Sequence, residues 1–309
     1  MGAHRAPEDR PAISPGSRSG FVALAGRPNV GKSTLVNAML GRKVAIVSDR
    51  PQTTRRAIRG VVSTDHWQLV LVDLPGVQRP RDSLTGRMQS RVQRELGESD
   101  VALLVLNGEQ GVGAGDRFIS GLLARAGTPL VVAVNKVDRL DRARTLSVLS
   151  EAARLQVGEE IFPVSARTGA GVAALLEHLA GRLPTGPFLY PAEQADDQPP
   201  DQLLAELVRE QVLRRMFDEL PHAVEAVLED LDLQSRADLA RVRVVLWVES
   251  ESQKRIVIGS GGAMIKAIGI AARRELEREL GRKVHLDLRV RVRRGWRSDD
   301  GLLDRLGID

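Results

Sequence analysis

The chain contains no cysteine, so disulfide bonds and thiolate metal sites are excluded and a reducing cytosol is permitted. Aromatic residues make up only 3% of the 309 residues, which leaves few side chains to stack on bases. No run of about 18 apolar residues occurs, so no transmembrane helix is predicted. Residues 1–19 hold prolines and charges without an apolar core, which excludes a secretory signal and predicts a disordered tail.

Positive charge is in modest excess. The sequence has 45 Lys and Arg against 40 Asp and Glu, a net charge of +5 and a pI near 10.0. This balance favours a polyanionic partner, either nucleic acid or an anionic membrane surface. Hydrophobic residues make up 42% of the chain, enough for packed cores, and the length predicts about two domains.

Strand-like and helical segments alternate over residues 20–183. Short apolar runs predict strands at 21–25, 67–72, 101–106, 130–134 and 161–164. Helical patterns lie between and after them, at 33–40, 84–96, 116–125, 141–155 and 172–183. This alternation predicts an α/β domain with a mostly parallel sheet, and continuous apolar strands agree because parallel strands are covered on both faces.

A proline-rich stretch at 184–202 predicts a linker to a second domain at 203–309. The patterns in this domain predict a helix at 203–220, strands at 223–230 and 241–249, a helix at 263–280 and a strand at 284–293. The expected order is therefore α-β-β-α-β, with a glycine cluster before the later helix, which indicates a small α+β domain.

The sequence GRPNVGKS at 26–33 fits the phosphate-loop pattern G-x-x-x-x-G-K-[ST], after a predicted strand and at the start of a predicted helix. Glycines let backbone N–H groups surround phosphates, Lys32 adds a point charge, and the Ser33 hydroxyl can ligate Mg²⁺. The alternative is a glycine-rich turn that matches this pattern by chance and binds no phosphate. The expected nucleotide-binding residues here are Gly26, Asn29, Val30, Gly31, Lys32, Ser33 and Thr34.

The segment DLPG at 73–76 ends the predicted strand 67–72. An acid at this point, beside a phosphate loop, can hold Mg²⁺ through water, so Asp73 is a candidate metal-binding residue. The Gly76 N–H is a candidate donor to a terminal phosphate. Taken alone, an Asp-x-Pro-Gly turn is common and could be only a turn.

Two further strand ends predict a preference for guanine. NKVD at 135–138 offers Asp138, a carboxylate that can accept from the two adjacent donors of guanine, which adenine lacks. Asn135 is expected to brace this loop, and Asn135, Lys136 and Asp138 are candidate nucleotide-binding residues. Ser165 and Ala166 end the next strand, where a backbone N–H can meet guanine O6. Ligands of open α/β sheets bind at such strand ends.

On these four motifs, residues 20–183 resemble the GTPase domain of translation-associated GTPases, which bind GTP or GDP with Mg²⁺. The resemblance implies that the segment QTTR at 52–55 is the switch whose threonine ligates Mg²⁺, and Thr54 fits better than Thr53. Alternatively, the two threonines belong to an ordinary polar loop without a ligand.

Many GTPases orient the attacking water with a glutamine after the D-x-x-G turn, but Val77 occupies this position. A subgroup with a hydrophobic residue there binds K⁺ with the help of a phosphate-loop asparagine that matches Asn29. The resemblance therefore predicts slow hydrolysis, faster in K⁺, with Lys32, Thr54 and Asn29 as catalytic residues. Asn29 could instead only brace the loop.

The glycine cluster at 259–262 has the pattern G-x-x-G, made of Gly259, Ser260, Gly261 and Gly262. With the surrounding element order, it resembles the KH fold of type II, which clamps single-stranded nucleic acid against this loop. Residues 236–297 carry 16 Lys and Arg against 7 Asp and Glu. Candidate RNA-binding cations are Lys254, Lys266, Arg255, Arg273 and Arg274, although each could simply lie on a solvated helix face.

The combination of the two domains, with the basic ending VRVRRGWR at 290–297, resembles the Era family of bacterial GTPases. The resemblance implies a monomer that binds the 3′ end of small-subunit rRNA, assists 30S subunit assembly and can associate peripherally with the inner membrane from the cytoplasm. Family members usually carry a basic residue inside the G-x-x-G loop, where this chain has Ser260, so the loop should bind RNA more weakly.

Two alternatives remain at the level of sequence. One is a membrane-surface GTPase whose basic C-terminal domain binds anionic lipid, since scattered cations suit either partner. The other is an RNA-binding scaffold with little GTPase activity, against which the intact nucleotide motifs argue.

Overall fold

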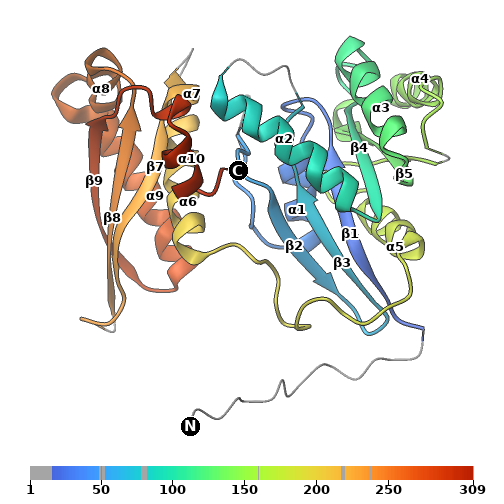
Figure 1. Cartoon of the computed structure of the whole chain (residues 1–309), viewed down its shortest axis with the longest axis horizontal. Helices are drawn as coiled ribbons and strands as arrows, with labels where there is room; N and C mark the ends of the chain where they lie inside the picture. Colours follow the sequence, from blue (N-terminus) through green and yellow to red (C-terminus); the bar gives the residue numbers. More distant parts are fainter. Residues whose placement is uncertain are drawn as a thin grey trace, which may run out of the picture. The chain divides into compact units, whose positions relative to one another are not determined.

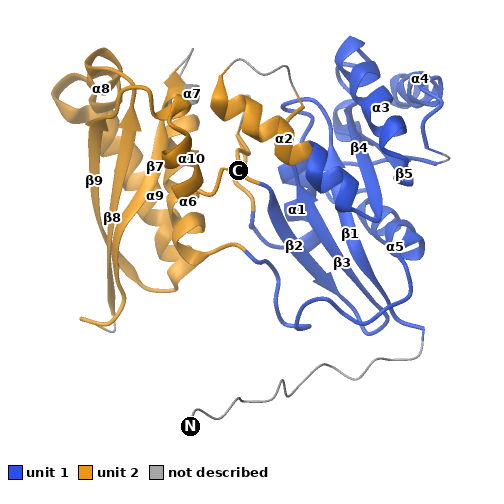
Figure 2. Ribbon diagram, in the orientation of Figure 1, with its two compact units in different colours: residues 1–44, 57–74, 93–197 blue, residues 45–56, 75–92, 198–309 orange. Residues whose placement is uncertain are grey.

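The computed structural model describes residues 16–48, 50, 53–77, 82–158, 160–216, 220–236 and 238–308. Contacts divide the chain into two compact units (Figure 2). Unit 1 comprises residues 1–44, 57–74 and 93–197, and unit 2 comprises residues 45–56, 75–92 and 198–309. The C-terminal unit therefore includes two short segments that the sequence places in the GTPase domain.

Within the described residues, the sheet of unit 1 has six strands in the order β2-β3-β1-β4-β5-β6 (Figure 1). They are β1 (Arg18–Ala25), β2 (Ile58–Ser63), β3 (Trp67–Asp73), β4 (Val101–Asn107), β5 (Leu130–Asn135) and β6 (Ile161–Pro163). Among these strands only β2 pairs antiparallel, with β3, so the predicted α/β fold with a mostly parallel sheet is confirmed. Strand β2 was not predicted, because Arg59, Gly60 and Ser63 interrupt its apolar run.

Helices follow the strands of unit 1 as the patterns predict. They are α1 (Lys32–Leu40), α3 (Ala114–Ala126), α4 (Arg142–Ala153) and α5 (Val172–Arg182), with a short 3₁₀ turn η1 (Val137–Arg139). Helix α2 (Ser83–Glu98) also follows a strand, β3, but its residues 83–92 belong to unit 2 and only its last residues to unit 1. Gly41 and Gly127 end α1 and α3 in the left-handed conformation, which glycine adopts without steric penalty. Helices α1 and α5 contact each other and strand β3. Helix α1 also contacts β2, α5 also contacts β1, and α4 contacts β5 and β6.

The described part of unit 2 contains a three-stranded sheet in the order β7-β8-β9, antiparallel and then parallel. Its strands are β7 (Glu225–Asp232), β8 (Leu239–Val248) and β9 (Lys283–Val292). Its helical elements are α6 (Pro200–Leu213), α7 (Leu220–Ala223), α8 (Glu251–Ile258), η2 (Ser260–Gly262), α9 (Ala263–Leu280), η3 (Trp296–Ser298) and α10 (Asp300–Arg305). The predicted small α+β domain of KH type is confirmed.

One core joins the long helices of unit 2 to its sheet. Buried side chains of α6 and α9, among them Val208, Ile268 and Leu276, pack with Val244 and Leu246 of β8. Helix α8 was not predicted, because a single apolar face on eight residues resembles the end of a strand. The observed order is therefore α-β-β-α-α-β between α6 and β9, with α7 as an extra short turn.

Three predicted boundaries shift in the structure. Strand β1 begins at Arg18, so the predicted tail at 1–19 is two residues too long, and residues 1–15 lie outside the described part of the chain. Arg18 pairs with Trp67, which extends the strand beyond its apolar run. Helix α6 begins at Pro200, inside the predicted linker, because proline is well tolerated in the first turn of a helix. It ends at Leu213, seven residues before the predicted end at 220.

Among the described residues, no single helix is long and apolar enough to cross a membrane. Only Glu251–Ile258 and Ser260–Leu280 pass such a test together, as a pair bent by 43°.

Candidate functional site

The phosphate loop closes around two glycines with positive φ angles. Gly26 has φ 156°, and a Cβ there would lie 2.5 Å from the Val105 carbonyl oxygen. Gly31 has φ 98°, and its Cβ would lie 2.4 Å from the Asn135 amide nitrogen. Any side chain at either position would therefore clash as well as strain the backbone. Helix α1 starts at Lys32, so its N-terminus and free N–H groups face the loop.

Lys32 is buried and donates to the carbonyl oxygens of Gly26 and Arg27 at 3.2 and 3.3 Å. Burial lowers the pKa of Lys32 to about 8, and the negative charge of Asp73 opposes the shift. A cation held by two carbonyl dipoles inside the loop is placed to meet phosphate oxygens, whose charge would raise the pKa again.

Ser33 and Asp73 meet at the start of α1 and the end of β3. The Ser33 hydroxyl donates to the Asp73 carboxylate at 2.6 Å. Parallel pairing of β1 with β3 places Leu24 opposite Asp73, which brings the buried carboxylate to the same sheet edge as the loop. Hydroxyl and carboxylate oxygens are the ligands that Mg²⁺ prefers, so this pair fits a magnesium site.

Asn135 ties the predicted base-recognition loop to the phosphate loop. Its amide donates to the Val30 carbonyl at 2.9 Å, and its side-chain oxygen accepts from the Lys136 and Ala166 N–H groups at 2.8 and 3.0 Å. Lys136, at φ 69°, sends its ammonium to the Asn29 carbonyl at 3.0 Å. One buried amide thereby fixes the spacing of three loops.

Asp138 is held by two neighbours. The Ser165 hydroxyl donates to Oδ1 at 2.7 Å, and Arg167 lies 2.7 Å from Oδ2. The Ser165 hydrogen bond, with a smaller contribution from Arg167, lowers the pKa of Asp138. The carboxylate is therefore ionised at neutral pH, as a paired contact with the two donors of guanine requires.

Unit 1 brings together most of the predicted nucleotide residues. These are Gly26, Asn29, Val30, Gly31, Lys32, Ser33, Thr34, Asp73, Asn135, Lys136, Asp138, Ser165 and Ala166. Thr54, Gly76 and Val77 lie in unit 2, so their place at this site stays a prediction. Gln52 lies outside the described residues.

The G-x-x-G loop of unit 2 connects α8 to α9. Gly259, Gly261 and Gly262 have φ angles of 75°, 56° and 79°, and Gly259 approaches Met264 so closely that a Cβ would lie 2.7 Å from the Met264 Cβ. Ser260 is exposed. The predicted cations Arg255, Lys266, Arg273 and Arg274 are exposed and Lys254 is half-buried.

Several residues with clear roles were not predicted. Arg167, next to Asp138, has no sequence signal beyond its position after Ser165. Buried charges on α6 and β7 were also missed, because Glu and Arg in an amphipathic pattern normally indicate a solvated face. Glu206, Arg209 and Glu225 are instead at most 5% exposed.

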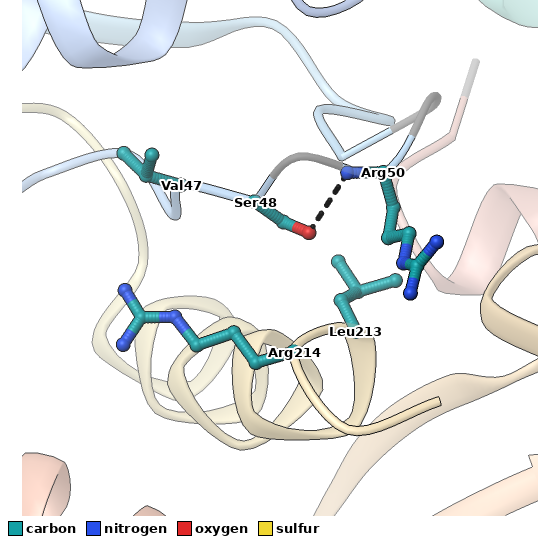
Figure 3. A pocket seen from close by; sticks show the side chains of 5 residues that line it. All are labelled: Val47, Ser48, Arg50, Leu213 and Arg214. Carbon is teal, nitrogen blue, oxygen red and sulfur yellow. Dashed lines mark hydrogen bonds between the residues drawn. The ribbon is translucent and has the colours of Figure 1, made fainter. Parts of the chain in front are cut away.

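A pocket of about 540 Å³ lies within unit 2, between the segment 45–56 and the end of α6 (Figure 3). Val47, Ser48, Arg50, Leu213 and Arg214 line it. The Ser48 hydroxyl accepts from the Arg50 N–H at 3.1 Å, and Arg214 is paired with Glu210 at 3.0 Å. The Val47 N–H donates to Glu210 of α6 at 3.0 Å, so the segment contacts the helix beside the pocket.

Comparison with known proteins matches both halves of the chain. Residues 21–136 match the family described as "50S ribosome-binding GTPase", and residues 219–297 match the "KH domain" family. The chain is 46% identical to "GTPase Era" of Mycobacterium sp. (strain KMS), over 94% of this chain and 99% of that one.

Solved structures agree over the same length. A crystal structure of Era in complex with MgGDPNP and nucleotides 1506–1542 of 16S ribosomal RNA matches with a TM-score of 0.90 at 32% identity. An Era variant of Aquifex aeolicus bound to GDP and AlF4⁻ matches with a TM-score of 0.89, also at 32% identity. Both comparisons cover 94% of this chain and 99% of the other.

Proposed function

Because this chain belongs to the Era family of GTPases, we propose that it is a GTP-operated switch that binds the 3′ end of small-subunit rRNA and assists 30S subunit assembly. One observation carries the proposal: a phosphate loop, an Mg²⁺-type Ser–Asp pair and a guanine-type carboxylate meet at one sheet edge, in a chain that also carries a KH domain.

The residues divide the work on the nucleotide. Lys32 and the N–H groups at the start of α1 bind the phosphates, and Asp138 reads the base with Asn135 and Ser165 as braces. Ser33, Asp73 and Thr54 would hold Mg²⁺, which neutralises charge on the outer phosphates. The Gly76 N–H would bind the terminal phosphate. When hydrolysis removes this phosphate, the switch segments would be released.

Hydrolysis depends on positioning rather than on a glutamine, since Val77 has no polar group for the attacking water. We place K⁺ beside Asn29, whose carbonyl already accepts from Lys136. A monovalent cation there stabilises the charge that develops as the phosphate bond breaks. Slow intrinsic turnover follows, faster in K⁺ than in Na⁺.

The KH face supplies the RNA contact. Gly259, Gly261 and Gly262 allow the nucleic acid backbone to approach, and Lys254 and Lys266 flank the loop with positive charge. Ser260 contributes a hydroxyl where a cation would strengthen binding. The protein acts as a monomer in the cytoplasm, where ribosomal subunits assemble.

Crosslinking tests the RNA assignment. The full chain is crosslinked to cellular RNA with GTP or GDP present, and the bound RNA is sequenced. We expect enrichment of the 3′ end of small-subunit rRNA that depends on the nucleotide and disappears in Lys32→Ala. Random RNA, or large-subunit rRNA as the description of the matched GTPase family would suggest, contradicts the assignment while leaving the GTPase activity intact.

Lipid binding is the alternative for the same basic surface. Filter binding to a single-stranded oligonucleotide is compared with sedimentation on anionic vesicles at matched salt. We expect tighter binding to the oligonucleotide, and vesicle binding that is peripheral and lost at high salt. Preference for vesicles would favour a membrane-surface GTPase instead.

A further inference from the structure

A network of buried charges in unit 2 contacts the residues on both sides of Thr54. Helix α6 and strand β7 supply Glu206, Arg209 and Glu225 to this network. The segment 53–56 supplies Arg55 and Arg56. All five side chains belong to the same compact unit, and only Arg56 is noticeably accessible to solvent, at 11% of its side chain.

The Arg55 side chain is fully buried against residues of the C-terminal domain. Its guanidinium donates to the Val224 carbonyl at 2.9 Å and forms a buried ion pair with Glu225. It also stacks over the Trp296 ring, 5.4 Å from the centroid. Burial lowers the pKa of Arg55 to about 10, and Glu225 opposes the shift, so the guanidinium remains charged at neutral pH.

Arg56 joins three partners of the same domain. It contacts Glu206 at 2.7 Å, Glu225 at 3.1 Å and the Leu306 carbonyl at 2.6 Å. Because a buried charge that loses its partner is strongly destabilising, Arg56 favours the arrangement in which all three contacts are made.

Arg209 acts on the main chain before Thr54. It pairs with Glu206 and donates to the Thr53 carbonyl oxygen. This carbonyl shares its peptide plane with the Thr54 N–H, so the hydrogen bond fixes that plane. With Arg55 anchored on the other side, the backbone of Thr54 is held at both ends.

Thr54 and Arg55 form the part of the segment that this network surrounds. Thr54 and Arg55 are 7% and 2% exposed, whereas Ser48 and Arg50 border the open pocket of Figure 3. The C-terminal domain therefore holds the part of the segment that contains the predicted Mg²⁺ ligand, and the hydrogen bond from the Val47 N–H to Glu210 at 3.0 Å adds a contact earlier in the segment.

We propose that Glu225 and Arg209 are positioning residues for Thr54, through which the C-terminal domain pre-orders the Mg²⁺-binding switch and favours the GTP-bound state. This inference rests on the proposed function, in which Thr54 binds Mg²⁺ beside GTP. Ordering the segment in advance removes an entropic cost that Mg²⁺ and GTP would otherwise meet on binding. GDP lacks the terminal phosphate beside which Thr54 would act, so ordering the segment should change GDP affinity little.

The test compares Glu225→Gln with Glu229→Gln in the full chain. Both remove a carboxylate from β7, but Glu229 pairs with Arg291 on β9 at 2.7 Å, away from the segment. With Mg²⁺ present, Glu225→Gln should weaken binding of the non-hydrolysable analogue GDPNP by about tenfold, the usual range of coupling between sites. It should change GDP affinity by less than about twofold and raise the Mg²⁺ concentration needed for hydrolysis. Glu229→Gln should change none of these.

Arg209→Lys provides a second test that keeps the charge but cannot pair with Glu206 and reach Thr53 in the same geometry. It should lower GDPNP affinity selectively, and thermal unfolding checks that each variant is folded. In a Thr54→Ala background the Glu225→Gln change should lose most of its effect, because both act through one residue.

The outcomes distinguish a failure of the positioning role from a failure of the proposed function. If folded Glu225→Gln and Arg209→Lys proteins bind GDPNP like wild type, or lose GDP and GDPNP affinity equally, the positioning role is overturned. Faster hydrolysis in these variants would overturn it as well, since the network would then be inhibitory. If wild type itself does not prefer guanine nucleotides, the proposed function fails first.

Discussion

Asn135 and Val30 are joined by a hydrogen bond of 2.9 Å from the buried side-chain amide to the main-chain carbonyl. The contact links the end of β5 to the phosphate loop, and the same amide group accepts from Ala166 after β6. A base-recognition carboxylate is useful only at a fixed distance from the phosphates. Asn135 sets that distance, so in the proposed function the specificity of Asp138 would depend on the whole sheet edge.

Asp138→Asn should change the preferred base. An amide presents one acceptor and one donor, so it loses a charge-assisted contact with guanine and suits xanthine, which has a carbonyl in place of the amine. We expect GTP affinity to fall roughly 10- to 100-fold, as for a lost hydrogen bond to a charged group. Xanthosine triphosphate (XTP) should bind more tightly to the variant than to the wild-type protein. Competition binding with GTP, XTP and ATP measures this, and unchanged GTP preference would remove Asp138 from base recognition.

Nucleotide binding should take up a proton at Lys32. The pKa of Lys32 is lowered to about 8 before binding, and phosphates favour the charged form, so affinity falls as pH rises past that value. Raising the pH from 7 to 8.5 should weaken GDP binding about fourfold in wild type. The matched Lys32→Met variant should bind weakly at both values, with a flatter pH dependence. A flat wild-type profile would contradict the mechanism.

Turnover should depend on the monovalent cation. With GTP and Mg²⁺ saturating, replacing Na⁺ by K⁺ should raise the rate about tenfold, the size of a modest transition-state stabilisation. Asn29→Ala should abolish most of this difference while nucleotide binding changes little. Equal wild-type rates in the two salts would show that Asn29 only braces the loop.

Glu225 should make the folded state sensitive to acid. Although burial opposes ionisation, the charges of Arg56, Arg55 and Arg209 lower the pKa of Glu225 from 4.5 to about 2. A lowered carboxyl pKa stabilises the folded state above pH 4.5, and this contribution is lost as pH falls towards 2. The stability gap between wild type and Glu225→Gln should shrink by about 2 kcal/mol between pH 6 and pH 3.

Urea unfolding followed by tryptophan fluorescence measures this gap. Glu229→Gln, on the same strand but with an exposed partner, gives the matched effect of removing a carboxylate outside the network. A gap between wild type and Glu225→Gln that stays constant with pH would mean that the carboxylate is not held ionised by its neighbours.

Ser260→Lys should strengthen RNA binding through the glycine loop. One added phosphate contact makes log K about 0.7 steeper against log salt for single-stranded nucleic acid. Gln234→Lys is the matched control, because its exposed turn precedes β8 whereas the G-x-x-G loop follows the far end of that strand. If both variants change affinity and salt dependence equally, the loop has no special role in the contact.

The nucleotide loops were predictable because their chemistry is local. GRPNVGKS fixes its own backbone through Gly26 and Gly31, and NKVD needs only a strand end to present Asp138. Strands β1, β3, β4 and β5 were predicted to within a few residues, since continuous apolar runs have few alternatives in an α/β fold. The G-x-x-G loop was recognisable for the same reason, although α8 beside it was not.

What the sequence by itself determined is the type of each domain and the backbone conformation of the motif loops, because glycine conformations and strand ends are encoded within a few residues. Only the tertiary structure decided which charges are buried. Glu206, Arg209 and Glu225 are residue types of a solvated surface, and they become a network around Thr53 and Arg55 only when segments 150 or more residues apart meet. Burial depends on what covers a side chain, and no local pattern records that.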